Sequence, residues 1–260
     1  MLRSLYIATN SMDVQQAKMN NVSNNLANLA TAGYKRNNVV VVDNFSKNLE
    51  LALEAHGPNG KKIPIGNGNL GNMVGQVYLD FSPGPLTQTD NETDMALEGN
   101  GFFVVESPDG EEFYTRDGSF HLDAEGNLLT NDGFQVLGEG GPINIDLEEK
   151  GRLVVKEDGT LVVGEGKDTE EIDKLLLMEF EDPGLLKKVD GNYFSDPEGT
   201  GDTAAATSVV QGWLERANVD PVQELIDMIP VARIYESSQK LIQVNDELLD
   251  KAINQVGRVK

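Results

Sequence analysis

Apolar residues near the N-terminal end recur with a seven-residue spacing. One series is Leu5, Met12, Met19 and Leu26, and a second series, three residues further along each time, is Ala8, Gln15, Val22 and Leu29. Apolar positions that alternate by three and four residues share one face of an α-helix and are typical of a coiled-coil seam. The pattern predicts a helix over residues 3–31, with Gly33 as the residue that ends it.

The C-terminal end repeats this pattern. Its seven-residue series is Met228, Tyr235, Ile242, Leu249 and Val256. Asp220 and Pro221 are typical of the N-cap and first residue of a helix, so a helix is expected to begin there. Pro230 lies inside the pattern and has no backbone N–H, so it is expected to kink this helix or to end a short first piece. The heptads predict packing but do not say whether the partner is in the same chain or in another.

The middle of the chain contains short β-rich runs separated by turn sequences. Asp-Gly pairs occur at 109–110, 117–118, 132–133 and 158–159, and Glu-Gly-Asn occurs at 125–127. Asp-Gly pairs supply the positive φ angles of tight hairpins, so an antiparallel meander is expected. Residues 174–183 are expected to form one long central strand or a pair of strands.

These patterns predict an α+β fold in four parts. Long, coiled-coil-like helices are expected in residues 1–45 and 208–260, on either side of a mainly antiparallel β domain at 81–207. Residues 46–80 contain a Gly- and Asn-rich run with weak periodicity. They are expected to form an extended or flexible arm.

Charge and glycine divide the chain at the same places. The net charge is −22, and residues 46–207 hold thirty-three Asp and Glu against eleven Lys and Arg. Each end is within two charges of neutral, and 24 of the 27 glycines lie in the same middle part. Phosphate contacts need clustered Lys and Arg, so a nucleic-acid partner is not expected. Near-neutral ends can crowd together, whereas the acidic part repels its copies unless it is held on the outside.

No motif in the chain supports an enzyme. There is no cysteine, which excludes thiol catalysis and disulfides. The two histidines, His56 and His121, lack a ligand-like spacing, and no P-loop, G-x-S-x-G or H-E-x-x-H occurs. Neither a metal nor a cofactor is expected. No apolar run is long enough for a membrane helix and the first residues do not read as a secretory signal, so membrane insertion is not expected.

Four segments resemble the signatures of one bacterial family. They are NNLANLATAGYKR at 24–36, GPLTQTDNETDMALEGNGFFVV at 84–105, YTRDGSF at 114–120 and GWLERANVDPVQELIDMIPVARIYE at 212–236. Together they resemble the signatures of the flagellar rod and hook proteins, the axial family of the bacterial flagellum. The resemblance covers both ends and the middle of the chain. The length of the chain favours a rod protein, of the distal-rod or proximal-rod type, over the much longer hook proteins.

The resemblance implies a structural subunit of the flagellar basal-body rod, outside the cytoplasmic membrane, that serves motility. Such a subunit would pass unfolded through the flagellum's own export apparatus and polymerise with copies of itself, beside adjacent rod and hook proteins. The terminal helices would build the inner tube, with the β domain facing outward. The expected self-assembly residues are Leu5, Met12, Met19, Val22, Asn25, Leu26, Asn28, Leu29, Met228, Tyr235, Ile242, Leu249 and Val256.

Two other classes of protein fit parts of the pattern. One is an extracytoplasmic carboxylate-dependent hydrolase or cation-binding β domain with helical arms, which would need a cleft with raised carboxyl pKa values. The other is an adaptor that uses its heptads on a foreign partner, which would not form filaments with itself at high concentration.

Five asparagines crowd the N-terminal helix, namely Asn20, Asn21, Asn24, Asn25 and Asn28. Each costs roughly 0.6 kcal/mol of helix propensity relative to alanine, or about 3 kcal/mol together. They lie beside the apolar seam, where amides can donate and accept hydrogen bonds across to neighbours. Low intrinsic helicity suits a segment that travels unfolded and becomes ordered only beside its neighbours.

Overall fold

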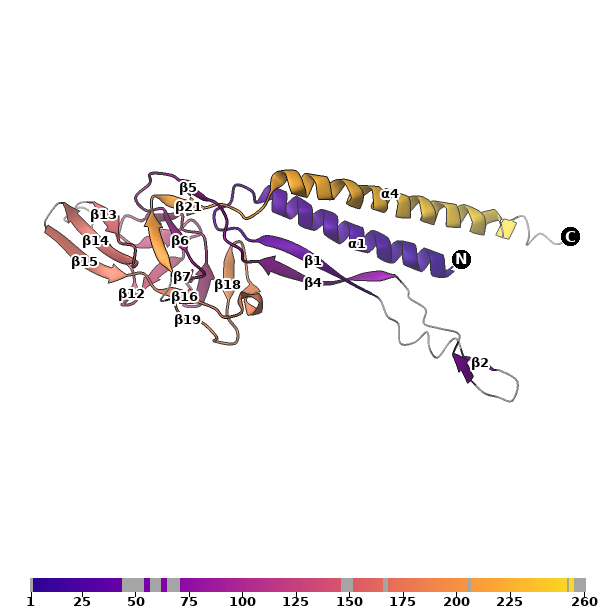
Figure 1. Ribbon diagram of the computed structural model, residues 1–260, viewed down its shortest axis with the longest axis horizontal. Helices are drawn as coiled ribbons and strands as arrows, with labels where there is room; N and C mark the ends of the chain where they lie inside the picture. Colours follow the sequence, from indigo (N-terminus) through magenta and orange to yellow (C-terminus); the bar gives the residue numbers. More distant parts are fainter. Residues whose placement is uncertain are drawn as a thin grey trace. The chain divides into compact units, whose positions relative to one another are not determined.

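The computed structural model describes residues 2–43, 54–56, 62–64, 71–145, 152–165, 168–204, 207–251 and 253–254. The chain forms two compact units (Figure 1). The helical unit comprises Met1–Leu26, Asn37–Tyr78 and Asp220–Lys260. The β unit comprises Ala27–Arg36 and Leu79–Val219. Residues 27–36, which the sequence groups with the N-terminal helix, thus associate with the β-rich part of the chain.

The described residues of the helical unit form two long helices and short strand pairs. Helix α1 is Leu2–Ala27 and helix α4 is Pro221–Lys251. Strand β1, Arg36–Asp43, pairs with β4, Asn72–Asp80, and β2, Glu54–His56, pairs with β3, Lys62–Pro64. Within this unit α1 runs beside α4 and beside the β1–β4 ribbon (Figure 1).

The structure corrects the predicted end of the first helix and excludes one of the two outcomes expected at Pro230, namely that the helix ends there. Helix α1 ends at Ala27, before the expected residue 31, because the chain turns at Asn28, whose carbonyl accepts a hydrogen bond from the Thr31 amide at 3.1 Å. Leu29 then packs with the buried Tyr34 of the β unit and leaves the helical seam. Helix α4 also continues through Pro230. Proline removes one intrahelical bond, but the turns on either side hold the helix together.

Where the structure describes the β unit, it contains short strands and one 3₁₀ turn. The strands are β5 Leu86–Gln88, β6 Met95–Glu98, β7 Phe102–Glu106, β8 Glu112–Thr115, β9 Phe120–Leu122, β10 Leu128–Thr130, β11 Gln135–Gly138, β12 Gly141–Pro142, β13 Leu153–Val155, β14 Thr160–Glu165, β15 Asp168–Lys174, β16 Leu177–Glu179, β17 Lys187–Lys188, β18 Tyr193–Ser195, β19 Asp202–Thr203, β20 Ser208–Gln211 and β21 Trp213–Glu215. The 3₁₀ turn, η1, is Pro183–Leu185.

The largest sheet runs in the order β17-β18-β8-β7-β11-β10-β9, with β12 beside β11, β16 beside β7 and β19 beside β16. A second sheet is β13-β14-β15, and β6 pairs with β20 and β5 with β21. The strand pairs within the described part of this unit are antiparallel. The prediction of a mainly antiparallel β domain between two helices is therefore confirmed.

Four of the five predicted turns join hairpin strands, and one does not. The turns at 109–110, 125–127, 132–133 and 158–159 connect β7 to β8, β9 to β10, β10 to β11 and β13 to β14. The prediction for 117–118 is wrong, because β8 and β9 are not paired. A Cβ atom on Gly118 would lie 1.7 Å from the Met95 carbonyl oxygen. Glycine is needed there for close approach of the backbone of β6.

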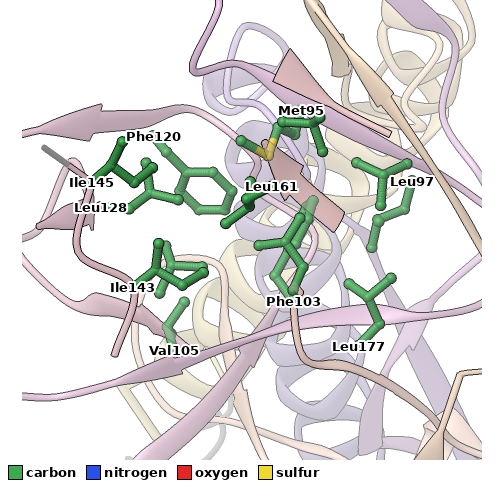
Figure 2. Packing of buried hydrophobic residues seen from close by; sticks show 14 of the residues in the cluster. Met95, Leu97, Phe103, Val105, Phe120, Leu128, Ile143, Ile145, Leu161 and Leu177 are labelled. Carbon is green, nitrogen blue, oxygen red and sulfur yellow. The ribbon is translucent and has the colours of Figure 1, made fainter. Parts of the chain in front are cut away.

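Strand β7 is covered on both faces, as its continuous apolar run requires. Phe103 points into the main core, where Figure 2 shows it among Met95, Phe120 and Leu161. Phe102 points to the opposite face, where Phe180, Leu186 and Phe194 form a second cluster. Of the run 174–183, predicted as a long central strand or strand pair, only residues 177–179 form a strand that lies between two others, β7 and β19.

Candidate assembly surfaces

Helices α1 and α4 pack against each other in opposite directions. The Ser4 hydroxyl donates to Asn245 Oδ1 at 3.2 Å, and the Ser238 hydroxyl donates to Ser11 Oγ at 3.2 Å. Moving seven residues forward along α1 therefore corresponds to seven residues backward along α4. The two helices form an antiparallel pair within the helical unit.

The α1 side of the seam follows the second apolar series. Ala8, Gln15 and Val22 are buried, whereas Leu5, Met12, Met19 and Leu26 of the first series are partly buried. Asn28 and Leu29, which lie beyond the end of α1, are partly buried as well. Early in the helix Tyr6 and Ile7 are exposed. The heptads thus mark the packed face of α1 but leave apolar surface beside it.

The predicted residues of α4 lie at the edge of its packed face. Met228, Tyr235, Ile242 and Leu249 are each partly buried, and Val256 lies outside the described residues. The buried positions are Glu224, Val231 and Ser238, which are also seven residues apart. Because Glu224 and Ser238 are polar, this row gave no apolar signal in the sequence.

A large apolar surface on α4 remains exposed, and we call it the α4 stripe. Its members are Val222, Leu225, Ile226, Ile229, Ile234, Leu241, Val244 and Leu248, each between 46% and 63% exposed. Successive members are mostly three, four or seven residues apart, so they lie on the sides of the helix away from the buried row. Exposed apolar surface of this extent marks a site of protein association.

A groove of about 410 Å³ lies between α1, β1 and α4. Val22 and Val39 contribute apolar surface, and Lys18 and Asp227 contribute opposite charges. Helix α4 also lines the groove with Pro230, Val231 and Ile234. The groove joins the α4 stripe to the packed face through Ile234.

Two of the five asparagines hold β1 against α1. Asn25 is fully buried, its Nδ2 donates to the Asn37 carbonyl at 3.1 Å, and its Oδ1 accepts from the Asn37 amide at 3.1 Å. Asn21 Nδ2 donates to the same carbonyl at 2.8 Å. The Asn25 amide therefore bonds both backbone groups of one strand residue, as a neighbouring strand would. Asn20 and Asn24 are exposed.

The loop at residues 27–36, which we call the signature loop, is bound to the β unit by its backbone. The Gly33 amide donates to the Glu215 carbonyl at 2.8 Å, and Asn192 Nδ2 donates to the Ala32 carbonyl at 2.8 Å. Gly33 has φ +64°, and a Cβ there would lie 2.3 Å from the Asp117 amide nitrogen. The sequence predicted Gly33 as a helix end, but its role is to bring two backbones together.

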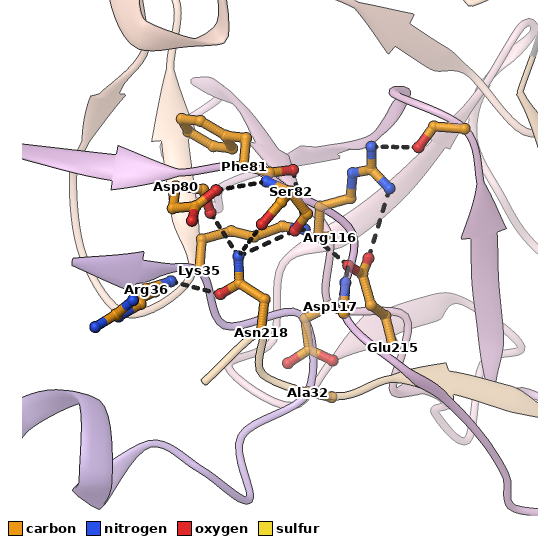
Figure 3. Close-up of polar contacts among 12 residues, drawn as sticks. Ala32, Lys35, Arg36, Asp80, Phe81, Ser82, Arg116, Asp117, Glu215 and Asn218 are labelled. Atoms are coloured by element: carbon orange, nitrogen blue, oxygen red, sulfur yellow. Dashed lines mark hydrogen bonds and ion pairs between the residues drawn. The ribbon is translucent and has the colours of Figure 1, made fainter. Parts of the chain in front are cut away.

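Buried charges hold the same loop. Lys35 Nζ donates to Glu215 Oε1 at 2.7 Å, and Arg116 lies 3.5 Å from Glu215 Oε2, with all three side chains at most 3% exposed (Figure 3). Arg116 also stacks over the Phe102 ring and donates to the Gly99 carbonyl at 2.7 Å. Burial lowers the pKa of Lys35 and of Arg116, and in both cases the Glu215 charge opposes that effect. The sequence did not single out Arg116, Glu215 or Asn218, although each lies in a quoted segment.

Little in the described residues suggests catalysis. Nowhere among them do three or more His, Cys, Asp or Glu side chains gather in a way that would hold a metal ion. His121 is exposed on β9. No helix in that part of the chain is long and apolar enough to cross a membrane.

Models of known families match three segments of the chain. Residues 5–35 match the flagella basal body rod protein model, residues 96–163 match the flagellar hook protein FlgE/F/G D1 domain, and residues 210–255 match the flagellar basal body rod FlgEFG protein C-terminal model. The first match covers most of α1 and the signature loop, and the third covers α4.

Relatives match nearly the whole chain. Flagellar basal-body rod protein FlgG of Buchnera aphidicola subsp. Acyrthosiphon pisum is 33% identical over 96% of this chain and 98% of its own length. FlgG of Bacillus subtilis is 32% identical over 98% of this chain and 99% of its own length, and FlgF of Caulobacter vibrioides is 31% identical over 98% of each. The chain therefore belongs to the flagellar basal-body rod proteins, which are structural, non-catalytic subunits of the basal body of the flagellum.

Proposed function

We propose that this rod subunit polymerises with copies of itself through its terminal helices into a tubular drive shaft for motility, with the α4 stripe as the main contact. The α4 stripe is the observation that carries the proposal. Burying one such Val, Leu or Ile side chain is worth about 1.5–3 kcal/mol, so a helix that leaves many of them in water gains greatly from a partner.

The charge distribution supports the same arrangement. The two ends of the chain are within two charges of neutral, so many copies of α1 and α4 can gather with little repulsion. The acidic middle part faces outward in the polymer, where salt screens it within about 8 Å. The helices then pack as a coiled-coil-like inner tube.

The expected self-assembly residues take different parts in this proposal. Leu5, Met12, Met19 and Leu26 on α1, and Met228, Tyr235, Ile242 and Leu249 on α4, flank the intramolecular seam and supply apolar edges to neighbouring copies. Val256 extends the α4 series. Asn25 acts indirectly, since its amide holds β1 on α1. Val22 lies in the packed face of α1, and Asn28 and Leu29 lie in the signature loop that follows α1.

The resemblance and the family membership support further partners. The subunit contacts adjacent rod and hook proteins at the ends of its own segment, and it reaches its place through the flagellar export apparatus in unfolded form. Helix α1, with its costly asparagines, is suited to remaining unfolded until neighbours are present. No comparison supports the hydrolase alternative.

Leu241→Asp tests the proposal. Leu241 is 55% exposed, so the monomer should keep its stability, whereas a charge inside a helix–helix contact should prevent polymerisation. Filaments of purified protein at high concentration are counted by electron microscopy, and motility is scored in cells that carry the variant as their only copy. We expect no filaments and no swimming.

Gln239→Asp is the matched control, because Gln239 is an exposed polar residue of the same helix outside the α4 stripe. It should polymerise and support swimming like the parent protein. Normal filaments from Leu241→Asp would refute the proposed contact. Equal failure of both variants would show that added charge on α4, rather than loss of the stripe, is responsible.

A further inference from the structure

The chain crosses between the helical unit and the β unit four times. The crossings follow Leu26, Arg36, Tyr78 and Val219. Three segments of the β unit therefore continue directly into the helical unit: the signature loop, the segment that begins at Leu79, and the segment that ends at Val219. Any force carried covalently from one unit to the other enters the β unit through these three segments.

One side chain ties the three segments together. Asn218 Oδ1 accepts a hydrogen bond from the Arg36 amide at 2.7 Å. Its Nδ2 donates to the Asp80 carbonyl at 2.7 Å and to the Ser82 carbonyl at 3.0 Å. Figure 3 shows Asn218 between these groups. One amide thus connects the crossing after Arg36, the crossing before Leu79 and the crossing after Val219.

A second side chain makes the same three-way connection more deeply. Lys35 Nζ, from the signature loop, donates to the Ser82 carbonyl at 3.0 Å and to Glu215 Oε1 at 2.7 Å. The same Glu215 oxygen accepts the Gly84 amide at 2.7 Å. Lys35 and Glu215 are buried, so water does not compete for these bonds. We call Lys35, Glu215 and Asn218 the clasp.

We propose that the clasp is a mechanical joint that shares load among the three connecting segments. A pull on one segment reaches the other two through Asn218 and Lys35, so the bonds resist together rather than breaking one after another. Stability alone does not explain the arrangement, because replacing a buried ion pair by apolar groups is often neutral or stabilising. The proposal rests on the proposed function, in which the subunit forms part of a rotating shaft.

A pulling experiment on the full-length monomer tests the clasp without requiring polymerisation. Because the chain has no cysteine, Met73→Cys in β4 and Ala124→Cys in the β9–β10 turn give two unique, exposed attachment points. Tension between them enters the β unit at Leu79. In Asn218→Ala the first opening step at fixed force should be on the order of tenfold faster or more, since several hydrogen bonds are lost.

Gln211→Ala is the matched control. Gln211 Nε2 donates to the Glu92 and Leu153 carbonyls at 2.7 and 3.0 Å, and its Oε1 accepts from the Val155 amide at 3.0 Å. It therefore links backbone segments of the β unit as Asn218 does, but its partners and Gln211 itself lie at least eight residues along the chain from a crossing, whereas the groups that Asn218 joins lie within four. Its removal should leave the first opening step unchanged. An equal acceleration in both variants would mean that Asn218 is an ordinary structural contact.

Asn218→Asp keeps the test decisive if the alanine variant does not fold. Aspartate retains the acceptor for Arg36, but its second oxygen faces the Asp80 and Ser82 carbonyls without a proton to donate, so its opening rate should exceed that of the parent. Folding of each variant is checked by fluorescence of Trp213, the one tryptophan in the sequence. If a folded Asn218→Asp opens no faster than the parent, the clasp does not share load.

Swimming at two viscosities extends the test to cells. Asn218→Asp should assemble rods and swim normally in dilute medium, and it should lose swimming speed disproportionately in viscous medium, where the shaft carries more torque. An equal fractional loss at both viscosities would contradict the mechanical role. Filament formation by the same purified variant tests polymerisation separately, so a failure of the clasp is distinguished from a failure of the proposed function.

Discussion

The β unit and the helical unit differ in how completely they bury their apolar side chains. The β unit encloses a core in which Phe103, Leu128 and Val136 are fully buried, and a second cluster covers the other face of β7. The helical unit buries one face of each helix and leaves the α4 stripe in water. The β unit covers its apolar side chains within a single chain, whereas the helical unit leaves apolar surface that copies of the chain cover in the proposed polymer.

The two units also differ in their net charge. The β unit lies mostly in the acidic middle part of the sequence, and the helical unit is built mostly from the near-neutral ends of the chain. Surface charge keeps a folded domain soluble, but it opposes close packing of identical surfaces. The net charge is therefore large in the β unit and small in the unit that we propose to pack against copies of itself.

Phe103→Ala should have the largest effect on stability and should distinguish the two units most clearly. The Phe103 side chain is fully buried in the main core, so truncation should cost the β unit about 3–5 kcal/mol. Denaturant unfolding followed by Trp213 fluorescence reports this unit, because Trp213 lies in β21. Leu241→Ala on the α4 stripe should change the same curve by less than about 0.5 kcal/mol. Equal losses in both variants would show that the units are not independent in this way.

Asn25→Ala should weaken the helical unit by an intermediate amount. It leaves both backbone groups of Asn37 without the Asn25 amide, at a cost of about 1–3 kcal/mol. Hydrogen exchange of the Asn37 amide, measured by NMR, should accelerate accordingly. Asn24→Ala is the neighbouring control, since Asn24 is exposed and alanine should gain about 0.6 kcal/mol of helix propensity there. Slower exchange of the Asn37 amide in the Asn25→Ala variant would refute the role of Asn25 in holding β1 against α1.

Asp117→Asn should have the smallest effect, below about 1 kcal/mol, and should stabilise the β unit at pH 7. Burial raises the pKa of the Asp117 carboxyl, nearby Asp132 and Asp94 raise it further, and hydrogen bonds from Ser119 oppose the shift. The folded state thus binds this proton more tightly than the unfolded state, so charged Asp117 costs stability at neutral pH. Asparagine retains the acceptor for Ser119 without the charge.

The pH dependence of this gain gives the measurement. The cost of Asp117 disappears as the pH falls from its raised pKa toward the ordinary value of 3.8, so the advantage of the variant should disappear over the same window. Unfolding curves at a series of pH values, with exposed Glu111→Gln as control, follow it. An advantage that stayed constant with pH would contradict the electrostatic cause.

Local patterns in the sequence predicted the elements of the fold well. Heptads predicted α1 and α4, and turn residues predicted four hairpins, because each signal depends on residues close together in the chain. The wrong details have long-range causes. Leu29 left the helix because Tyr34 and Ala217 offered a buried contact, and Gly118 was needed for a strand twenty residues away.

The site was less predictable than the fold. The series Met228, Tyr235, Ile242 and Leu249 predicted that α4 packs, but periodicity did not tell which side of α4 would meet α1. The buried row at Glu224 and Ser238 is polar, so the helix face that packs carries fewer apolar residues than the face that does not. The ion pair between Lys35 and Glu215 left no local pattern at all.

The sequence separation of Lys35 and Glu215 also bears on the order in which contacts form during folding. Asn25 and Asn37 are 12 residues apart, whereas Lys35 and Glu215 are 180 apart. Closing the longer loop costs roughly 2.4 kcal/mol more in chain entropy. We therefore expect the Asn25–Asn37 contact between α1 and β1 to form early and the Lys35–Glu215 contact of the signature loop to form late. A chain in which the C-terminal part is absent or unfolded offers Lys35 no Glu215 carboxylate. The bound signature loop therefore requires both ends of the chain.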